Sequence, residues 1–396
     1  MFDWIASAVG VALAIAALRT HRTLRAALED GARPERLAHY PSLTVIRPIK
    51  GLDPEAEENL RAGLDHGYPG SVETLFVFDA EDDPVVSLAR QAIAERRASG
   101  GRETLEILFC GDPPPGRTGK LNAMIHGLRH ACGDLVAFVD SDVRSDRDAL
   151  RIAVETLLSD PKAGSAAAPA VVTPRPRSLC DAASAILLNG LYSPSSRLEA
   201  RRRGELPFIM GQLMVFRREA LRAIGNLEDV AGNFVDDIQI GAHLRRAGFR
   251  NLLTRHAVEI IWLGARWTGF FENFVRWMTF SRGFEWRPFK LGVMLRISAF
   301  FVGILGGATL AAAGHAAASL TWLGAAAVVT GSVGRLHAAM GGHPLGLRNG
   351  IAPAIVLLLA PVVFVRVYTQ KRVAWRGRSY ELDRSGRLAR RSASPY

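Results

Sequence analysis

Short apolar runs alternate with helix-like stretches between residues 42 and 169. The short runs predict strands at residues 43–47, 73–79, 105–110 and 135–140. The stretches between and after them predict helices at residues 55–64, 84–97, 120–130 and 146–158. Strands and helices that alternate at this spacing form a parallel sheet with helices on both faces, so the predicted fold class is α/β.

Longer apolar segments lie outside this region, at residues 4–18, 297–314, 317–333 and 351–365. The first is followed by Arg19, Arg22 and Arg25, which is typical of a signal anchor whose basic flank stays in the cytoplasm. This segment is short for a membrane span, so tilt or bilayer thinning is expected. If the other three all cross, the C-terminal tail lies opposite the α/β region. The basic tail argues against that outcome, so one segment is a candidate re-entrant segment and the parity stays open.

Three further segments have distinct patterns. Residues 237–247 predict an amphipathic helix that ends at Gly248. Residues 262–286 are rich in aromatic residues and arginine, including Trp286, a composition typical of a membrane–water interface. Residues 181–203 have a mixed pattern that is compatible with a position along the membrane surface.

The net charge of +11 is unevenly distributed. Residues 371–396 contain eight lysines or arginines and two acidic residues. Basic residues beside apolar segments favour contact with anionic lipid headgroups. No segment interleaves aromatic and basic residues in the manner of a nucleic-acid-binding module, so we expect no nucleic-acid partner.

Carboxylates follow the predicted strands. Asp140 and Asp142 come directly after one buried strand, and Asp79 ends another. The carboxyl ends of strands are where open α/β sheets bind ligands. Two buried carboxylates one residue apart require ion pairing or a divalent cation, although an acidic turn explains the pair equally well when it is taken alone.

Two helix beginnings supply further candidates. Lys120 follows Gly119 at the start of a predicted helix, which suits a phosphate group, but the spacing excludes a nucleotide P-loop. Asp236 and Asp237 begin the amphipathic helix, where acids complement the helix dipole in any protein. The functional interpretation is a general base beside a sugar acceptor.

Arg276 and Trp277 stand in the aromatic segment. An arginine is suited to diphosphate charge and an indole face to the wall of a sugar pocket. An interfacial anchor is the alternative interpretation of the same pair.

In combination and in this order, these motifs resemble those of membrane-anchored GT-A glycosyltransferases, most closely the ceramide glucosyltransferase type. The resemblance extends over nearly the whole chain. It rests on residues 47–54, 65–69, 79–84, 120–122, 140–142, 210–214, 236–237, 276–277 and 375–378. It implies a GT-A, Rossmann-like nucleotide-diphospho-sugar transferase domain with N- and C-terminal transmembrane helices.

The resemblance also implies roles at the donor. Asp79 would contact the nucleotide base or ribose. Asp140 and Asp142 would hold Mg²⁺ or Mn²⁺ on the donor diphosphate, with Lys120 nearby.

At the acceptor, Asp237 would be the catalytic base with Asp236 beside it, and Arg276 and Trp277 would complete the donor site. The implied reaction is an inverting transfer of a hexose, glucose or a relative, from a UDP-sugar to a hydroxyl of a membrane lipid. Ceramide is the first acceptor to consider.

Two departures from the family pattern concern the acceptor. Asn273 stands where the family has Gln or Arg, and residues 192–196 lack a histidine that is typical of ceramide-type enzymes. Bacterial hopanoid glycosyltransferases are similar over the same motifs, so the choice between ceramide and hopanoid stays open.

The resulting domain prediction has five parts. They are an anchor at 1–20, a GT-A domain at 40–290, a membrane-interface segment at 262–290 within it, transmembrane helices at 291–370 and a basic tail at 371–396. We expect a multi-pass protein of the inner (cytoplasmic) membrane, with the catalytic domain facing the cytoplasm.

Three other functions are alternatives. A processive polysaccharide synthase would usually carry Gln at the position of Asn273 and more spanning helices. A nucleotidyl- or phosphosugar transferase would release pyrophosphate or a nucleoside monophosphate. A non-enzymatic scaffold gives no reason for carboxylates to recur at Asp79, Asp140 and Asp237.

Overall fold

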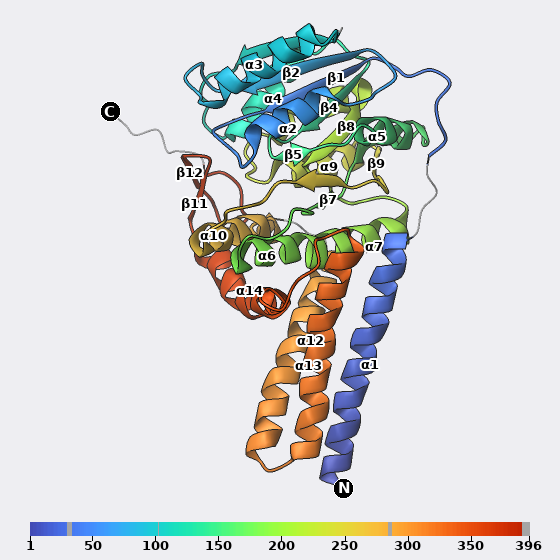
Figure 1. Ribbon diagram of the computed structural model, residues 1–396, viewed down its shortest axis with the longest axis vertical. Helices are drawn as coiled ribbons and strands as arrows, with labels where there is room; N and C mark the ends of the chain where they lie inside the picture. Colours follow the sequence, from blue (N-terminus) through green and yellow to red (C-terminus); the bar gives the residue numbers. More distant parts are fainter. Residues whose placement is uncertain (30–33, 102, 284–286, 390–396) are drawn as a thin grey trace.

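Residues 1–29, 34–101, 103–283 and 287–389 are described by the computed structural model. An α/β domain lies above a layer of shorter helices, and long helices extend from that layer away from the domain (Figure 1). The position of Trp286, which the aromatic pattern assigned to a membrane interface, lies outside the described residues.

The main sheet has seven strands in the order β3-β2-β1-β4-β8-β6-β9. The predicted strands β1 (Leu43–Pro48), β2 (Val72–Phe78), β3 (Thr104–Phe109) and β4 (Leu135–Val139) are parallel. Strand β8 (Leu213–Arg217) runs antiparallel to both β4 and β6 (Ala163–Ala167), and β9 (Arg250–Leu253) pairs with β6 in parallel. The sheet is therefore mixed, not wholly parallel as predicted, because the chain enters β8 beside the end of β4.

Helices cover both faces of this sheet, as predicted. Successive strand residues point to opposite faces, so alternate positions join different cores. Ile46 packs with α4 (Gly119–His130) and α9 (Asp236–Arg246), whereas Leu43 and Val45 pack with α5 (Ala149–Leu158). A third core joins α2 (Ala56–Leu64) and α3 (Val85–Ala98) to β2. Two short helical segments, α8 (Arg218–Ala223) and η2 (Gly225–Val230), connect β8 to α9.

The helical layer lies between the domain and the long helices (Figure 1). It contains α6 (Leu179–Ile186), the π-helix η1 (Leu187–Tyr192), α7 (Ser193–Arg203), α10 (Trp267–Met278) and α11 (Phe280–Gly283). A small sheet of β5 (Val143–Arg144), β10 (Val258–Ile260) and β7 (Ala170–Val171) borders the layer. The mixed pattern at 181–203 thus belongs to helices that pack beneath the domain.

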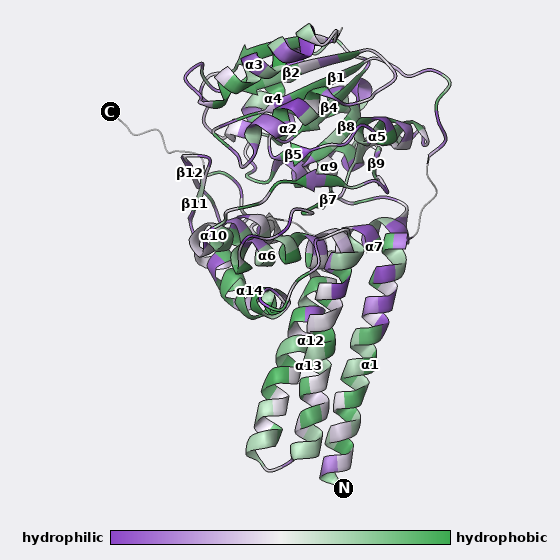
Figure 2. Ribbon diagram, viewed as in Figure 1, coloured by the Kyte–Doolittle hydropathy of each residue, from purple (hydrophilic) through white to green (hydrophobic). Residues whose placement is uncertain are grey.

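Four helices in the described part of the chain are long and apolar enough to cross a membrane. Helices α1 (Phe2–Glu29), α12 (Arg287–Ala312) and α13 (Ala316–Ala339) extend side by side and are mainly apolar along their outer lengths (Figure 2). Close approach depends on small residues, since a Cβ on Gly306 would come within 2.2 Å of the Trp322 ring. The 28 residues of α1 span about 42 Å, because the helix continues through the basic residues beyond the apolar segment.

The fourth long helix takes a different course from the other three. Helix α14 (Ala352–Thr369) packs against α6 and α10 in the layer and not alongside the three long helices (Figure 1). The hairpin of β11 (Arg372–Trp375) and β12 (Arg378–Glu381) follows it. The hairpin lies beside the α/β domain, so the C-terminal segment and the domain share one side of the bundle.

Candidate active site

One cavity brings together every site residue predicted from the sequence. It lies between the carboxyl edge of the sheet and the helical layer, and its lining includes Asp79, Lys120, Asp140, Asp142, Asp236, Asp237, Arg276 and Trp277. These side chains come from the ends of strands β2 and β4, from the first turns of helices α4 and α9, and from helix α10. The catalytic and binding roles that the family resemblance implies for these residues remain predictions.

Buried cations fix the loop after β4. Lys120 forms an ion pair with Asp140, and its Nζ donates a hydrogen bond to the Gly211 carbonyl at 3.2 Å. Below the loop, the guanidinium of Arg47 donates to the main-chain carbonyls of Asp140 and Val143, both at 3.1 Å. Burial raises the pKa of Asp140, and the Lys120 charge opposes that rise.

The Asp142 carboxylate has no hydrogen-bond or ion-pair partner within the described ranges. Burial and the neighbouring carboxylates of Asp140 and Asp53 raise the pKa of Asp142 to about 6. A carboxylate in this position requires a cation, and its hard oxygen atoms suit Mg²⁺ or Mn²⁺. No group of three or more His, Cys, Asp or Glu side chains among the described residues is arranged to hold a metal. Asp140 and Asp142 therefore fit a cation whose other ligands come from water and substrate phosphates.

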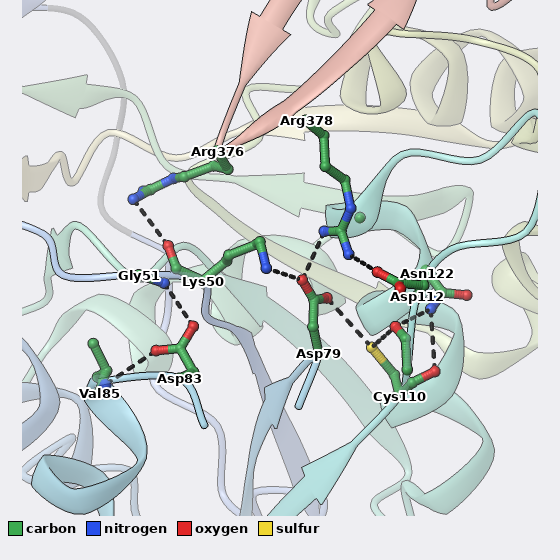
Figure 3. A network of polar contacts seen from close by, with 12 residues as sticks. Lys50, Gly51, Asp79, Asp83, Val85, Cys110, Asp112, Asn122, Arg376 and Arg378 are labelled. Carbon is green, nitrogen blue, oxygen red and sulfur yellow. Dashed lines mark hydrogen bonds and ion pairs between the residues drawn. The ribbon is translucent and has the colours of Figure 1, made fainter. Parts of the chain in front are cut away.

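The carboxylate of Asp79 is held by cations from two directions (Figure 3). Its Oδ2 lies 2.6 Å from Lys50 Nζ and 2.6 Å from an Nη of Arg378. Nearby Asp83 accepts hydrogen bonds from the backbone N–H groups of Gly51 and Val85 at 2.8 and 3.0 Å. Asp83 therefore caps the start of α3, whereas Asp79 faces the cavity.

Asp236 and Asp237 form the first turn of α9, as predicted. Asp237 Oδ1 accepts the Ile238 N–H at 2.8 Å, whereas the buried Asp236 Oδ2 has no hydrogen-bond partner in the described structure. A Cβ on Gly211 would lie 2.7 Å from Asp237 Oδ2, so only glycine leaves room for this carboxylate. Burial and the Asp236 charge raise the pKa of Asp237 to about 7. At neutral pH this group can accept a proton from a bound hydroxyl.

Helix α10 supplies a guanidinium and an indole. Arg276 donates a hydrogen bond to the Asn273 side chain, and no carboxylate in the described part of the chain pairs with it. Burial lowers the pKa of Arg276 to about 10, a value at which it stays charged. The Trp277 ring lies 5.8 Å from Tyr192 and 5.2 Å from Trp262, centroid to centroid, and these rings form an aromatic wall.

The cavity also contains residues for which no role was predicted from the sequence: Lys50, Tyr192, Trp375, Arg376, Arg378 and Tyr380. Four of them belong to the hairpin β11–β12. The basic composition of this segment favoured lipid headgroups, yet Arg378 points to the Asp79 carboxylate (Figure 3). Arg376 forms an ion pair with Asp53. The motif at 375–378 was a signal of family resemblance, but nothing in it indicates which distant residues it meets.

The whole-chain pattern decides the family. The model of glycosyltransferase family 21 matches residues 3–388. The chain belongs to glycosyltransferase family 21. It is therefore a glycosyltransferase, similar to ceramide glucosyltransferases, as the sequence predicted.

Named relatives of this family 21 enzyme match over shorter regions. A ceramide glucosyltransferase of Candida albicans is 29% identical over 124 residues, 30% of this chain and 23% of the relative. One from Komagataella phaffii is 30% identical over 118 residues, 29% of this chain and 22% of the relative. The chain thus matches less than a quarter of the length of each.

This family 21 enzyme resembles a solved structure over most of the length of both chains. That structure is the mannosyltransferase PcManGT from Pyrobaculum calidifontis in complex with GDP-Man and Mn²⁺. The TM-score is 0.50 at 22% identity, and the alignment covers 91% of this chain and 99% of the mannosyltransferase. This similarity confirms the predicted GT-A fold.

Proposed function

We propose that this enzyme is an inverting glycosyltransferase that moves a hexose, glucose or a relative, from a UDP-sugar to a hydroxyl of a membrane lipid. Ceramide is the acceptor that the family favours. The observation that carries the proposal is a single cavity with two chemically different sides. Carboxylates and cations at the sheet edge suit a metal-bound nucleotide diphosphate, and Asp237 lies toward an aromatic wall built on the helical layer.

The construction of that wall supports a lipid acceptor. Arg296 of α12 donates hydrogen bonds to the Leu191 carbonyl at 3.2 Å and to Ser195 Oγ at 2.6 Å. On the other side of η1, Asn189 contacts His337 of α13 at 3.3 Å. The segment that carries Tyr192 therefore rests directly on helices that are apolar enough to enter a membrane. An acceptor hydroxyl can approach Asp237 from the bilayer plane.

The proposed reaction is a direct displacement. The acceptor oxygen attacks the anomeric carbon, a new C–O bond forms, and the bond from that carbon to the diphosphate oxygen breaks. Asp237 takes the proton of the acceptor hydroxyl, while Lys120 and Arg276 balance charge on the departing nucleoside diphosphate. A divalent cation held by Asp140 and Asp142 would supply further charge neutralisation for the diphosphate. A direct displacement with Asp237 as the base inverts the configuration at the anomeric carbon.

We also propose the membrane arrangement predicted from the sequence. Residues 1–20 anchor the chain, 40–290 form the GT-A domain and include the interface segment 262–290, 291–370 carry the C-terminal helices and 371–396 form the basic tail. The basic residues at the domain end of α1 favour a cytoplasmic catalytic domain in an inner membrane. The proposed partners are the nucleotide sugar, the lipid acceptor and the bilayer, without nucleic acid.

The test uses the full chain purified in lipid nanodiscs with Mn²⁺ or Mg²⁺. Labelled UDP-glucose and other UDP-hexoses are supplied in parallel with ceramide or a hopanoid polyol, and lipid products are identified by mass spectrometry. We expect a monoglycosylated lipid and one UDP released per transfer. Long polymer would instead indicate a polysaccharide synthase, and pyrophosphate or UMP would indicate nucleotidyl or phosphosugar transfer. A product with the hopanoid alone would assign the alternative acceptor.

A further inference from the structure

The C-terminal hairpin is docked on the cavity by contacts at several points. Arg378 lies 2.6 Å from Asp79 and 2.5 Å from Asp112, and the Tyr380 hydroxyl accepts the Gly119 N–H at 3.1 Å. The rings of Trp375 and Tyr380 also pack against Phe234. These contacts set the position of the hairpin turn over the start of α4.

The turn places an arginine in a backbone conformation that disfavours it. Arg376 has φ 51° and the next residue, Gly377, has φ 74°, so both central residues are left-handed, as in a type I′ turn. Asparagine, aspartate and glycine are the residues that usually occupy the first of these positions. Turn geometry therefore gives no reason for arginine here, and the reason must lie in the side chain.

Only one of the guanidinium nitrogens of Arg376 donates hydrogen bonds to the described residues. Its Nη1 donates to Asp53 Oδ1 at 2.6 Å and to the Lys50 carbonyl at 3.2 Å. Within the described residues, its Nε and Nη2 have no hydrogen-bond partner. Asp53 in turn accepts a hydrogen bond from the Ser141 hydroxyl at 2.5 Å, next to Asp140 and Asp142. Arg376 is thus oriented toward the loop that carries Asp140 and Asp142, and its Nε and Nη2 donors remain available for a ligand.

A second guanidinium faces the same space. Arg276 and Arg376 both line the cavity, and the guanidinium of Arg276 lies 5.2 Å from the Trp375 ring centroid. The positive charge of Arg376 is one of the influences that lower the pKa of Arg276. Asp140 and Asp142 partly offset these two positive charges. Arginine binds phosphate oxygens with two parallel hydrogen bonds, so both guanidiniums suit a phosphate group in this cavity.

We propose that Arg376 binds the diphosphate of the nucleotide-sugar donor together with Arg276, so that the C-terminal hairpin is part of the donor site. This inference rests on the proposed function and adds a residue from the far end of the chain to it. The Arg376–Asp53 ion pair holds the guanidinium in place, and the free Nε and Nη2 donors meet the phosphate oxygens.

The decisive variant is Arg376→Asn, measured in full-length protein in nanodiscs. Asparagine followed by glycine is a favoured type I′ turn, so the hairpin should keep its fold while the positive charge is lost. We expect UDP with Mn²⁺ to bind about tenfold more weakly, or weaker still, because a charge-assisted hydrogen bond is removed. The thermal unfolding midpoint should change little, because relief of the left-handed backbone conformation at position 376 offsets the lost ion pair with Asp53.

Arg372→Asn is the matched control from the same hairpin. Arg372 pairs with Glu381 at 2.6 Å on the exposed side and does not line the cavity. It should bind UDP with an affinity within about twofold of the wild type, as is usual for surface substitutions. Asp53→Asn keeps the guanidinium while breaking its ion pair, so its loss of UDP affinity should be smaller than that of Arg376→Asn.

Two results would overturn the inference: UDP affinity unchanged in Arg376→Asn, or equal losses in Arg376→Asn and Asp53→Asn. The second would assign Arg376 to hairpin docking alone. In either case, a wild-type enzyme that binds UDP leaves the proposed function intact. A wild-type enzyme that binds neither UDP nor GDP in the presence of Mn²⁺ would contradict the proposed function itself.

Discussion

Asp237 combines three properties at the scale of a single residue. It is fixed at a helix start, it fills space that only a glycine at position 211 leaves open, and its pKa is raised to about 7 by burial and by Asp236. A raised pKa means that the carboxyl is protonated at a higher pH than an ordinary aspartate. Because a base must be ionised to accept a proton, activity should be lost as the pH falls through this pKa.

The first prediction concerns this pH dependence. We expect kcat/KM for lipid glycosylation to fall about tenfold per pH unit below roughly pH 7 and to level off above it. Asp237→Asn should lower kcat by about 10²- to 10⁴-fold and remove the inflection. Glu219→Gln, an exposed acid in the first turn of α8, is the control and should leave the profile unchanged. A profile in Asp237→Asn like that of the wild type would refute the assignment of the base.

The second prediction concerns the cation. Asp142→Asn should abolish the gain in UDP affinity that Mn²⁺ or Mg²⁺ gives the wild type. The substitution removes the Asp142 carboxylate, which has no partner in the described structure and is therefore the proposed ligand of the cation. UDP affinity in EDTA should be the same in both proteins. Asp146→Asn is the control, since the Asp146 carboxylate contacts His256 at 2.8 Å and not the cavity. An undiminished metal effect in Asp142→Asn would exclude this carboxylate as a ligand.

The position of a residue at the end of a strand or the start of a helix explains which site residues could be predicted from the sequence. Asp79, Asp140 and Asp237 follow a strand or begin a helix, so their meeting at one sheet edge follows from the α/β pattern. The Arg376–Asp53 pair joins residues 323 positions apart, and no local pattern encodes that contact. The hairpin side of the cavity therefore required the three-dimensional structure.

At the scale of elements, η1 connects the cavity to the long helices. Its segment has a π-helical backbone, and Arg296 of α12 donates to the carbonyls of Gly190 and Leu191 at 3.4 and 3.2 Å. π-helical turns in helices are frequently found at functional sites. The position of Tyr192 in the cavity wall thus depends on an arginine in a different helix.

The third prediction tests this dependence. Arg296→Met should lower the free energy of unfolding by about 1–3 kcal/mol, because buried carbonyls and the Ser195 hydroxyl lose a donor. The midpoint of thermal unfolding in nanodiscs measures the effect, and kcat should fall with it. Arg335→Met, at an exposed position of α13, should change stability by less than about 0.5 kcal/mol. Equal stability of the two variants would contradict a supporting role for Arg296.

Several elements gave weak signals in the sequence for physical reasons. Strand β6 reads Ala-Gly-Ser-Ala-Ala, without the β-branched or aromatic residues that mark a strand. Helix α6 is buried on all sides, from Cys180 to Ile186, so it lacks the one-sided apolar pattern of an exposed helix. The first four strands and their helices, by contrast, were predicted because each has a clear local pattern.

At the scale of the whole molecule, the course of α14 places the C-terminal hairpin on the domain side of the long helices (Figure 1). Helices α12 and α13 form a hairpin that leaves the layer and returns to it, and α14 remains in the layer (Figure 1). The sequence left this open because α14 is as apolar as a spanning helix, and only its packing on α6 and α10 distinguishes it.

The fourth prediction is the sidedness of the chain. In variants that carry one cysteine each, native Cys132 and Ser385→Cys should react with a membrane-impermeant maleimide from the same side. Ala313→Cys, in the turn between α12 and α13, should react from the opposite side. All three positions are exposed. Labelling of Ser385→Cys from the Ala313 side would contradict the arrangement.

The position of the hairpin after the last apolar helix has a consequence for biosynthesis. Trp375, Arg376 and Tyr380 are translated after the α/β domain and all four long apolar helices. A nascent chain can therefore fold its sheet and present its carboxylates while one wall of the cavity is still missing. With Arg376 as the donor-binding residue that we propose, the enzyme would gain its full affinity for nucleotide sugar only after the hairpin has been synthesised. Incompletely synthesised chains would thus bind the nucleotide sugar weakly.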